Sequence, residues 1–170
     1  GRDTLIWLTI QGQADDRDRQ AVQVVQQVAD LAAESGLRVA LYPHVGFYVA
    51  STEDALRVAK KAQRKNVGVS FNLCHCLRLG NEQKIPALLR DALPHLYAVS
   101  INGADHEGDW DRLIQTLDRG SYDVQGLLSL LTDLGYNGPI GLQCYSIPGD
   151  IRENLTRSIR AWTKFKEQIN

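Results

Sequence analysis

The chain has 170 residues, of which 44% are hydrophobic and 23% are charged, as expected for one soluble globular domain. Its 19 basic and 20 acidic residues leave a net charge of −1, so we expect no basic surface that would recruit nucleic acid. The sequence contains neither a polybasic segment nor an apolar run long enough to span a membrane, which argues against a membrane partner. The odd number of cysteines, three, argues against a disulfide scaffold.

Five short apolar segments rich in β-branched residues recur along the chain and predict β-strands. They cover residues 5–10, 38–42, 67–72, 96–102 and 140–145. Each segment is apolar on both faces, which is typical of a strand that is covered on both sides in a parallel sheet.

Segments with apolar residues at helical spacing separate these strands and predict five helices. They cover residues 18–35, 51–64, 81–93, 124–134 and the residues that follow 148–150. Gly36 provides a left-handed cap for the first helix, and Ser51 and Asp54 have the spacing of a capping box. Asp123 is expected to cap the fourth helix. Residues 103–123 form the longest irregular stretch, and loops of that length are usually functional or disordered.

The alternation of strands with helices predicts parallel strands joined by right-handed crossovers. A doubly wound sheet and a (β/α)₈ barrel both satisfy this order. No glycine-rich phosphate loop follows the first strand, which removes the commonest reason for a doubly wound sheet. We therefore expect an α/β fold, an incomplete TIM barrel of five parallel βα units, with residues 1–170 as a single domain.

Histidines stand at the carboxyl ends of three predicted strands, which is where parallel βα folds place their sites. These are His44, His75 and His106, whereas His95 precedes a strand and is expected to be structural at the opposite rim. Because a barrel directs several strand ends toward one point, we expect His44 and His75 to line a ligand pocket. The alternative is that they form hydrogen bonds with loop carbonyls.

The segment Cys74-His75-Cys76 has the composition of a metal motif but not its spacing. A closed zinc site usually has a CxxC pair with a second pair elsewhere. If the chain leaves the third strand extended, alternate side chains also point in opposite directions. We therefore predict no metal site here.

Four blocks of sequence resemble the xylose isomerase-like TIM barrels, which include sugar-phosphate isomerases and epimerases. They read RVALYPH, NVGVSFNLCH, LYAVSINGAD and RGSYDVQGLLSLLTDLGYNGPIGLQCY, in that order. The last block, with its GYNGPIGLQ turn and strand, is the most specific. The resemblance spans about 160 residues. It implies that the five strands are strands four to eight of the barrel, with strands one to three absent from this chain.

The resemblance also implies a divalent metal site, such as one for Mn²⁺ or Mg²⁺, at four strand ends. In this chain the four positions are Tyr42, Asn72, Ser100 and Gln143, none of which is a carboxylate. Neutral oxygens do not offset the desolvation of Mg²⁺ or Mn²⁺, so no metal cofactor is expected. His44 and His75 match family positions that contact substrate.

Three hypotheses on function follow. In the first, the chain binds a sugar or polyol through His44 and His75 and a polar set comprising Tyr42, Asn72, Ser100, Asn102, Asp105 and Gln143. In the second, it is an active isomerase, epimerase or lyase with His44 or His75 as the catalytic base. In the third, it is a structural or interaction module, completed by oligomerisation or by an N-terminal fragment, because five strands leave two open sheet edges.

Two further expectations concern the tryptophans and the compartment. Trp7 and Trp162 are expected in the core, and Trp110 in the long loop is a candidate to cap the pocket or stack on a sugar. Since no secretory signal is visible, a cytoplasmic location is the default. The start at Gly1 rather than Met leaves a trimmed leader as the alternative.

Overall fold

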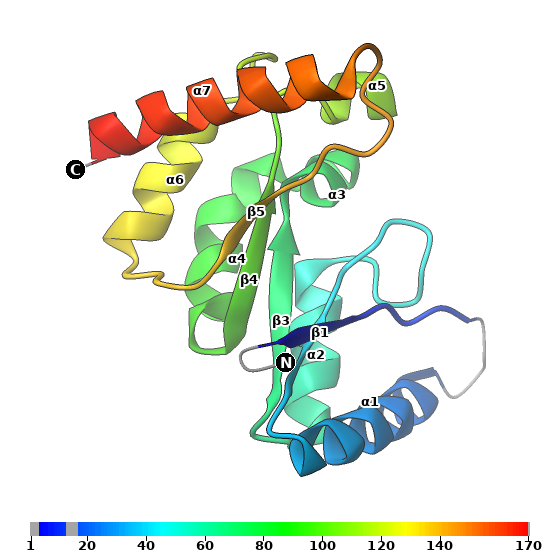
Figure 1. The fold of residues 1–170 in the computed structure, drawn as a ribbon. Coiled ribbons are helices and arrows are strands. Elements are labelled where there is room, and N and C mark those ends of the chain that lie inside the picture. Colours follow the sequence, from blue (N-terminus) through cyan, green and yellow to red (C-terminus); the bar gives the residue numbers. More distant parts are fainter. Residues whose placement is uncertain (1–3, 13–16, 170) are drawn as a thin grey trace.

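The structure, a computed structural model, describes residues 4–12 and 17–169. Within these residues five parallel strands form one sheet in the order β1-β2-β3-β4-β5 (Figure 1). Their bounds are β1 Leu5–Leu8, β2 Arg38–Leu41, β3 Val67–Asn72, β4 Leu96–Ile101 and β5 Ile140–Leu142. Spatial order follows chain order, as expected for successive βα units of a barrel, and the prediction of an incomplete TIM barrel is confirmed.

Helices connect the strands, and the five predicted ones begin and end close to the predicted residues, whereas α3 and α5 were not predicted. They are α1 Arg17–Glu34, α2 Thr52–Ala62, α3 Leu73–Arg78, α4 Ile85–Ala92, α5 Trp110–Leu113, α6 Val124–Asp133 and α7 Ile151–Ile169, with short 3₁₀ turns at Glu82–Lys84 and Leu93–His95. The capping box of Ser51 and Asp54 is present, and Asp123 accepts a hydrogen bond from the amide of Gly126 at 2.8 Å. Gly36 has a φ of 66°, which confirms the predicted left-handed cap.

The two faces of the sheet differ in composition. Side chains at alternate positions of the strands, such as Val39, Val69 and Phe71, are fully buried in the core beneath the helices. In β2 and β3 the intervening positions carry small or polar residues, and in the register Asn72 pairs with Ser100 and Ser100 with Gly141. The apolar core therefore lies between the sheet and its helices, and polar groups line the concave face.

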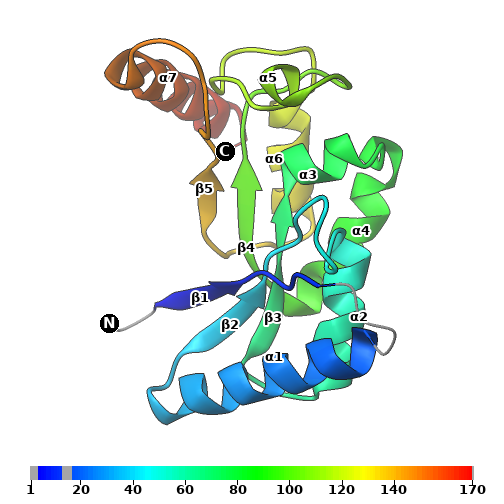
Figure 2. The same ribbon diagram turned by 90° about the vertical axis from the view of Figure 1, so that its right-hand side faces the viewer.

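The sheet curves into a half-barrel with two open edges. Figures 1 and 2 show α1, α2, α4 and α6 on the outer side of the sheet. A closed barrel of this type has eight strands. In the described part of the chain β1 and β5 each have one strand neighbour, so their outer edges remain unpaired.

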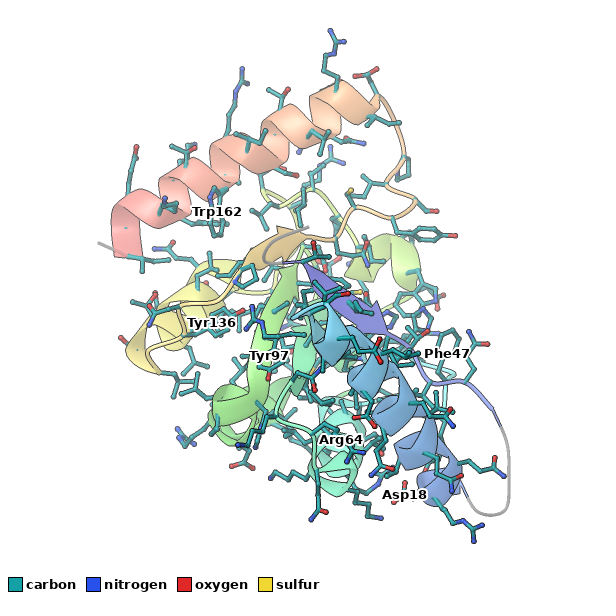
Figure 3. The ribbon with its side chains drawn as sticks, turned by 60° about the horizontal axis from the view of Figure 1, so that its bottom comes forward. Asp18, Phe47, Arg64, Tyr97, Tyr136 and Trp162 are labelled. Atoms are coloured by element: carbon teal, nitrogen blue, oxygen red, sulfur yellow. The ribbon has the colours of Figure 1, made fainter. Side chains whose placement is uncertain are left out.

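At the amino ends of the strands, Tyr97 of β4 packs against residues of the neighbouring strands (Figure 3). Its ring packs on Gly68, where an added Cβ would come within 2.7 Å of the ring. The Tyr97 hydroxyl donates to the carbonyl of Lys65 at 3.2 Å, and the Arg38 guanidinium lies 4.8 Å from the ring centre. Side chains thus fill this end of the half-barrel and leave the carboxyl ends for a site.

Two details of the sequence interpretation were wrong. The chain does not leave β3 in an extended conformation, because α3 begins directly after Asn72 and contains Cys74, His75 and Cys76. Trp7 is 47% exposed rather than buried in the core, because β1 is an edge strand and the ring lies on the concave face against Tyr42. Trp162 of α7 is half-buried and packs against the core, as expected.

Candidate functional site

A cavity of about 670 Å³ lies at the carboxyl ends of the strands. We call it the strand-end cavity, and its lining residues are Tyr42, His44, Val45, His75, Trp110, Asp111, Ile114, Gln143, Tyr145 and Ser146. Some of them follow β2 or β5, and the others belong to α3 or α5 or directly follow α5. The parallel topology brings them together because all strand ends of one sense meet at one rim.

His44 and His75 form the centre of this cavity. Their ring centres are 4.2 Å apart, and the planes are inclined by 46°. The His44 Nδ1 lies 2.8 Å from the carbonyl oxygen of Val45, so this nitrogen carries the proton and donates. The amide of Val45 donates to the His75 Nδ1 at 3.3 Å, so that nitrogen carries a lone pair. One residue thereby orients both imidazoles.

In the neutral form of each ring, these hydrogen bonds assign opposite tautomers to His44 and His75. With its proton on Nδ1, His44 has a free acceptor at Nε2. With its lone pair on Nδ1, His75 has a donor at Nε2. The pair therefore offers one acceptor and one donor at adjacent points of the cavity, which suits a hydroxyl group or a carbonyl with a neighbouring acidic hydrogen.

Burial keeps His75 neutral at physiological pH. Its side chain is only 6% exposed, and burial, followed by the proximity of His44, lowers its pKa to about 4. A charged imidazolium would lose its hydration here without gaining a carboxylate partner. The donor at Nε2 is therefore a neutral N–H across the pH range in which most proteins work.

Tyr42 presents a hydroxyl group whose proton is free to be donated. Its oxygen accepts hydrogen bonds from the amide groups of Asn72 and of Gln143, the latter at 3.3 Å. Burial and the nearby thiol of Cys74 raise the pKa of Tyr42 to about 12, so the phenol stays protonated. Because two donors already occupy its lone pairs, the phenolic proton is left for a ligand.

Aromatic rings surround these polar groups. Trp7 stacks on Tyr42 with ring centres 5.0 Å apart, and Phe47 stacks on His44 at 4.2 Å. Trp110 meets His75 edge to face at 5.3 Å and remains 39% exposed, so part of its ring is available to a ligand. Such rings offer flat apolar faces next to hydrogen-bonding groups.

The lining of the strand-end cavity holds one carboxylate and neither lysine nor arginine. The carboxylate belongs to Asp111, next to Trp110. No group of three or more histidine, cysteine, aspartate or glutamate side chains within residues 4–12 and 17–169 is arranged to hold a metal ion. The donor set around His44 and His75 thus offers mainly neutral hydrogen-bonding atoms.

The structure gathers four of the predicted site residues and separates the others. Tyr42, His44, His75 and Gln143 line the strand-end cavity. Asn72 lies behind Tyr42, to which its amide donates, while its carbonyl oxygen accepts from the thiol of Cys74 at 3.0 Å. Asn72 therefore positions Tyr42 and does not line this cavity.

Ser100, Asn102 and Asp105 also lie outside the lining of the strand-end cavity. Ser100 is buried within β4, and the amide of Asn102 donates to the carbonyls of Gly103 and Leu113, at 2.9 and 2.6 Å. The carboxylate of Asp105 is paired with Arg112 and accepts from the backbone and hydroxyl of Ser121. Asn102 and Asp105 thus hold the long loop after β4.

Five lining residues were not selected from the sequence: Val45, Asp111, Ile114, Tyr145 and Ser146. Tyr145 follows Gln143 by two residues, so the same rule of strand ends could have found it. Asp111 had no such signal, because its position depends on how the loop after β4 folds back as α5. His106 was considered as a further candidate, but it pairs with Glu82 at 2.8 Å, away from His44 and His75.

A family model described as the xylose isomerase-like TIM barrel matches residues 5–165. The chain belongs to this family. The match includes all five strands and thus the strand ends that carry the cavity. The resemblance inferred from the four sequence blocks is confirmed.

Solved structures of similar fold include several sugar epimerases. A D-tagatose 3-epimerase-like protein aligns with a TM-score of 0.76 at 16% identity, over 98% of this chain and 63% of that one. The IolI protein, solved with a zinc atom, aligns with a TM-score of 0.79 at 16% identity, over 98% and 64%. D-psicose 3-epimerase from Clostridium cellulolyticum H10 aligns with a TM-score of 0.75 at 17% identity, over 94% and 59%. At this identity the likeness shows the fold alone.

A curated relative is an uncharacterized protein, MJ1311, from Methanocaldococcus jannaschii. It is 23% identical over 125 residues, which are 70% of this chain and 41% of that protein. The chain therefore spans less than half of this relative and less than two thirds of the three structures above. The rest of each of those proteins lies outside the matched region.

Proposed function

We propose that this sugar isomerase- and epimerase-like barrel chain binds an uncharged carbohydrate or polyol in the strand-end cavity. The observation that carries the proposal is the convergence of His44, His75, Tyr42 and Gln143 on one cavity with exposed aromatic faces. Hydroxyl groups both donate and accept, which matches the mixture of free acceptor and donor atoms there. Because no cation lines the cavity and Asp111 does, a phosphorylated sugar would meet repulsion instead of a partner.

We further propose that the metal site of the family is degenerate in this chain. By resemblance, its four positions correspond to Tyr42, Asn72, Ser100 and Gln143. The phenol of Tyr42 remains protonated, and the Asn72 amide is used in hydrogen bonds to Tyr42 and Cys74. These neutral groups do not fit a Mn²⁺ or Mg²⁺ ion, which requires carboxylate oxygens to replace its hydration shell. No step of the proposed chemistry therefore involves a metal.

A second candidate function is proton transfer by the histidine pair, as in an isomerase, epimerase or lyase. The opposite tautomers of His44 and His75 favour it. The Nε2 of His44 would take a proton from the carbon next to a carbonyl, and the Nε2–H of His75 would donate a hydrogen bond to the carbonyl oxygen. A neutral imidazole is a suitable donor to a developing enolate, since its proton is not lost to water first.

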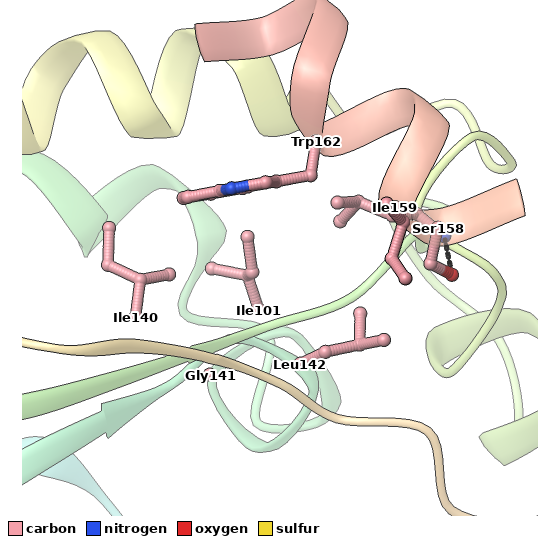
Figure 4. Close-up of a pocket in the computed structure, with 8 residues that line it drawn as sticks. Ile101, Ile140, Gly141, Leu142, Ser158, Ile159 and Trp162 are labelled. Atoms are coloured by element: carbon pink, nitrogen blue, oxygen red, sulfur yellow. Dashed lines mark hydrogen bonds between the residues drawn. The ribbon is translucent and has the colours of Figure 1, made fainter. Parts of the chain in front are cut away.

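We also propose that the open edges of the half-barrel are covered by further βα units in the functional molecule. A cavity of about 200 Å³ lies between α7 and the end of the sheet formed by β4 and the edge strand β5 (Figure 4). We call it the edge cavity, and it is lined by Ile101, Leu117, Ile140, Gly141, Leu142, Ser158, Ile159 and Trp162. The larger size of the matched structures supports three additional βα units as its occupant, whose first strand would pair with β5 and place apolar side chains in the cavity.

The binding proposal is tested by calorimetric titration with a panel of neutral ketoses and polyols and with the corresponding phosphate esters. We expect saturable binding of at least one neutral compound, with the phosphate ester binding more weakly. His75→Ala should abolish this binding, whereas the matched control His95→Ala, at the opposite rim, should retain it. Binding that prefers the phosphate ester, or that survives His75→Ala, would overturn the proposal.

The metal proposal is tested by elemental analysis of the purified chain together with thermal-shift titrations of Mn²⁺, Mg²⁺, Co²⁺ and Zn²⁺. We expect no stoichiometric metal and no shift of the unfolding midpoint. An equimolar ion with a midpoint that rises on titration would contradict a degenerate site.

The edge proposal is tested on the chain alone by sedimentation equilibrium, binding of an apolar dye and hydrogen exchange of the β5 amides. A monomer that binds the dye and exchanges these amides rapidly is expected. A dimer with protected amides would show that a second copy covers the edge. A monomer with protected edges and no dye binding would show that the half-barrel needs no further units.

A further inference from the structure

A third cavity, of about 440 Å³, lies between the start of α6, the middle of α7 and the segment that precedes α6. We call it the basic cavity. It is lined by Leu117, Asp118, Arg119, Gly120, Tyr122, Asp123, Val124, Gln125, Arg157, Arg160, Ala161, Lys164 and Phe165. Figure 1 shows α7 packed across α6 on the outer side of the half-barrel. This cavity shares no lining residue with the strand-end cavity.

Positive charges are concentrated in this cavity, although the chain as a whole carries a net charge of −1. Arg157, Arg160 and Lys164 follow one another at intervals of three and four residues, so they lie on one face of α7, and Arg119 of the segment before α6 also lines the cavity. Like charges at this spacing destabilise a helix unless another charge neutralises them.

The two carboxylates of the lining neutralise this cluster only in part. The carboxylate of Asp118 accepts from Thr116 at 2.6 Å and is paired with Arg157 at 2.7 Å. Asp123 accepts from the amide of Gly126 and caps α6. Within the described parts of the chain, the remaining three cations have no hydrogen-bond or ion-pair partner; they are Arg119, Arg160 and Lys164.

The floor of the basic cavity is apolar. Leu117, Val124 and Ala161 are buried, and the half-buried rings of Tyr122 and Phe165 complete it. A ligand that fits both parts carries its charge at one end and a small apolar group at the other. Guanidinium groups favour phosphate oxygens because their planar N–H donors match two oxygens at once.

We propose that the basic cavity is a binding site for a small organic phosphate, with the phosphate held by Arg119, Arg160 and Lys164 and the organic group on the apolar floor. The site lies apart from the strand-end cavity and is independent of the uncharged ligand proposed there. One face of the half-barrel thus recognises neutral hydroxyl groups, and another recognises a dianion.

The test is calorimetric titration of the whole chain with phenyl phosphate, inorganic phosphate and phenol, at a constant ionic strength of about 0.15 M, where the Debye length is about 8 Å. We expect saturable binding of phenyl phosphate, weaker binding of inorganic phosphate and none of phenol. The double substitution Arg160→Gln with Lys164→Gln should weaken binding by about tenfold or more, since charge-assisted hydrogen bonds are lost.

Arg152→Gln is the matched control, because Arg152 is an exposed cation of α7 outside the cavity lining. It should leave binding unchanged, and both variants should keep the unfolding midpoint of the ligand-free chain or raise it. No saturable binding of phenyl phosphate, or equal weakening by Arg152→Gln, would overturn the proposal. Equal affinity for inorganic and phenyl phosphate would overturn the assigned role of the apolar floor.

Discussion

The strand-end cavity and the edge cavity border the same sheet, but the first is lined by several polar side chains and the second mainly by apolar ones. The strand-end cavity contains two histidines, a tyrosine and a glutamine whose free atoms point to one space. In the edge cavity, Ser158 provides the only polar side chain, and its hydroxyl accepts from the amide of Leu117 at 3.1 Å (Figure 4). The first cavity offers hydrogen bonds to a ligand, whereas the second offers apolar surface alone.

This difference follows from the positions of the two cavities, one at the carboxyl ends of the strands and the other in the layer between sheet and helices. Side chains at the carboxyl ends of strands leave the packed layer between sheet and helices, so polar groups are tolerated there. The edge cavity lies within that layer, between α7 and the strands β4 and β5, and its lining is apolar because this layer is the packed interior. A polar cavity with convergent groups indicates a small-molecule ligand, and an apolar one at a sheet edge indicates a protein segment.

The largest loss of stability should come from shortening a buried side chain that lines the edge cavity. Ile101 is 1% exposed, so Ile101→Ala should lower the free energy of unfolding by about 2–5 kcal/mol. Ile159 lines the same cavity but is 62% exposed, and Ile159→Ala should cost less than about 1 kcal/mol. Urea denaturation measures both values. Equal costs would mean that the cavity is already covered on the side of Ile159.

Acidification should lower the stability of the protein through His75 in the strand-end cavity. The His75 imidazole has an ordinary pKa near 6.5 in the unfolded chain and about 4 when folded, so between these values the unfolded chain binds a proton that the folded protein does not. Stability should therefore fall as the pH drops from about 7 to 4, with His75 contributing about 3 kcal/mol. The measurement compares urea denaturation of the natural chain and of His75→Gln at several pH values. A variant with the same pH dependence would show that other groups cause the loss.

A smaller effect should follow from removing the phenolic hydroxyl of the strand-end cavity. Tyr42→Phe deprives the amide groups of Asn72 and Gln143 of their acceptor, so stability should fall by about 1–2 kcal/mol. Binding of a neutral sugar or polyol should weaken by about tenfold, because the donor toward the ligand is lost. Tyr145→Phe is the control, since Tyr145 lines the same cavity but is 74% exposed. Equal losses in both variants would remove the special role assigned to Tyr42.

The smallest effect concerns the single polar side chain of the edge cavity. Ser158→Ala leaves the buried amide of Leu117 without its acceptor and should cost about 1 kcal/mol, with no change in ligand binding at the strand-end cavity. Denaturation and titration of the same variant measure the two quantities. A change in sugar binding would show that the two cavities are coupled and do not act independently.

The sequence predicted the order of the elements and the polar residues at the strand ends, but not the fold of the long loop after β4. Alternating apolar runs and helix caps predicted the order of the elements, because these signals act within one segment. The parallel topology then placed His44, His75, Tyr42 and Gln143 at one rim, where the structure brings them together. No local pattern predicted that Asn102 and Asp105 would turn away to hold the long loop after β4.

The sequence by itself determined the parallel βα architecture, the family and the histidine pair at the strand ends, since each depends on residue type and spacing. The tertiary structure decided the tautomers of His44 and His75, which Val45 sets through its backbone, and the start of α3 directly after β3. It also decided that Trp7 lies on the open concave face, because that depends on which strand forms the edge of the sheet. Such features arise from contacts between segments far apart in the chain, which no local pattern of residues records.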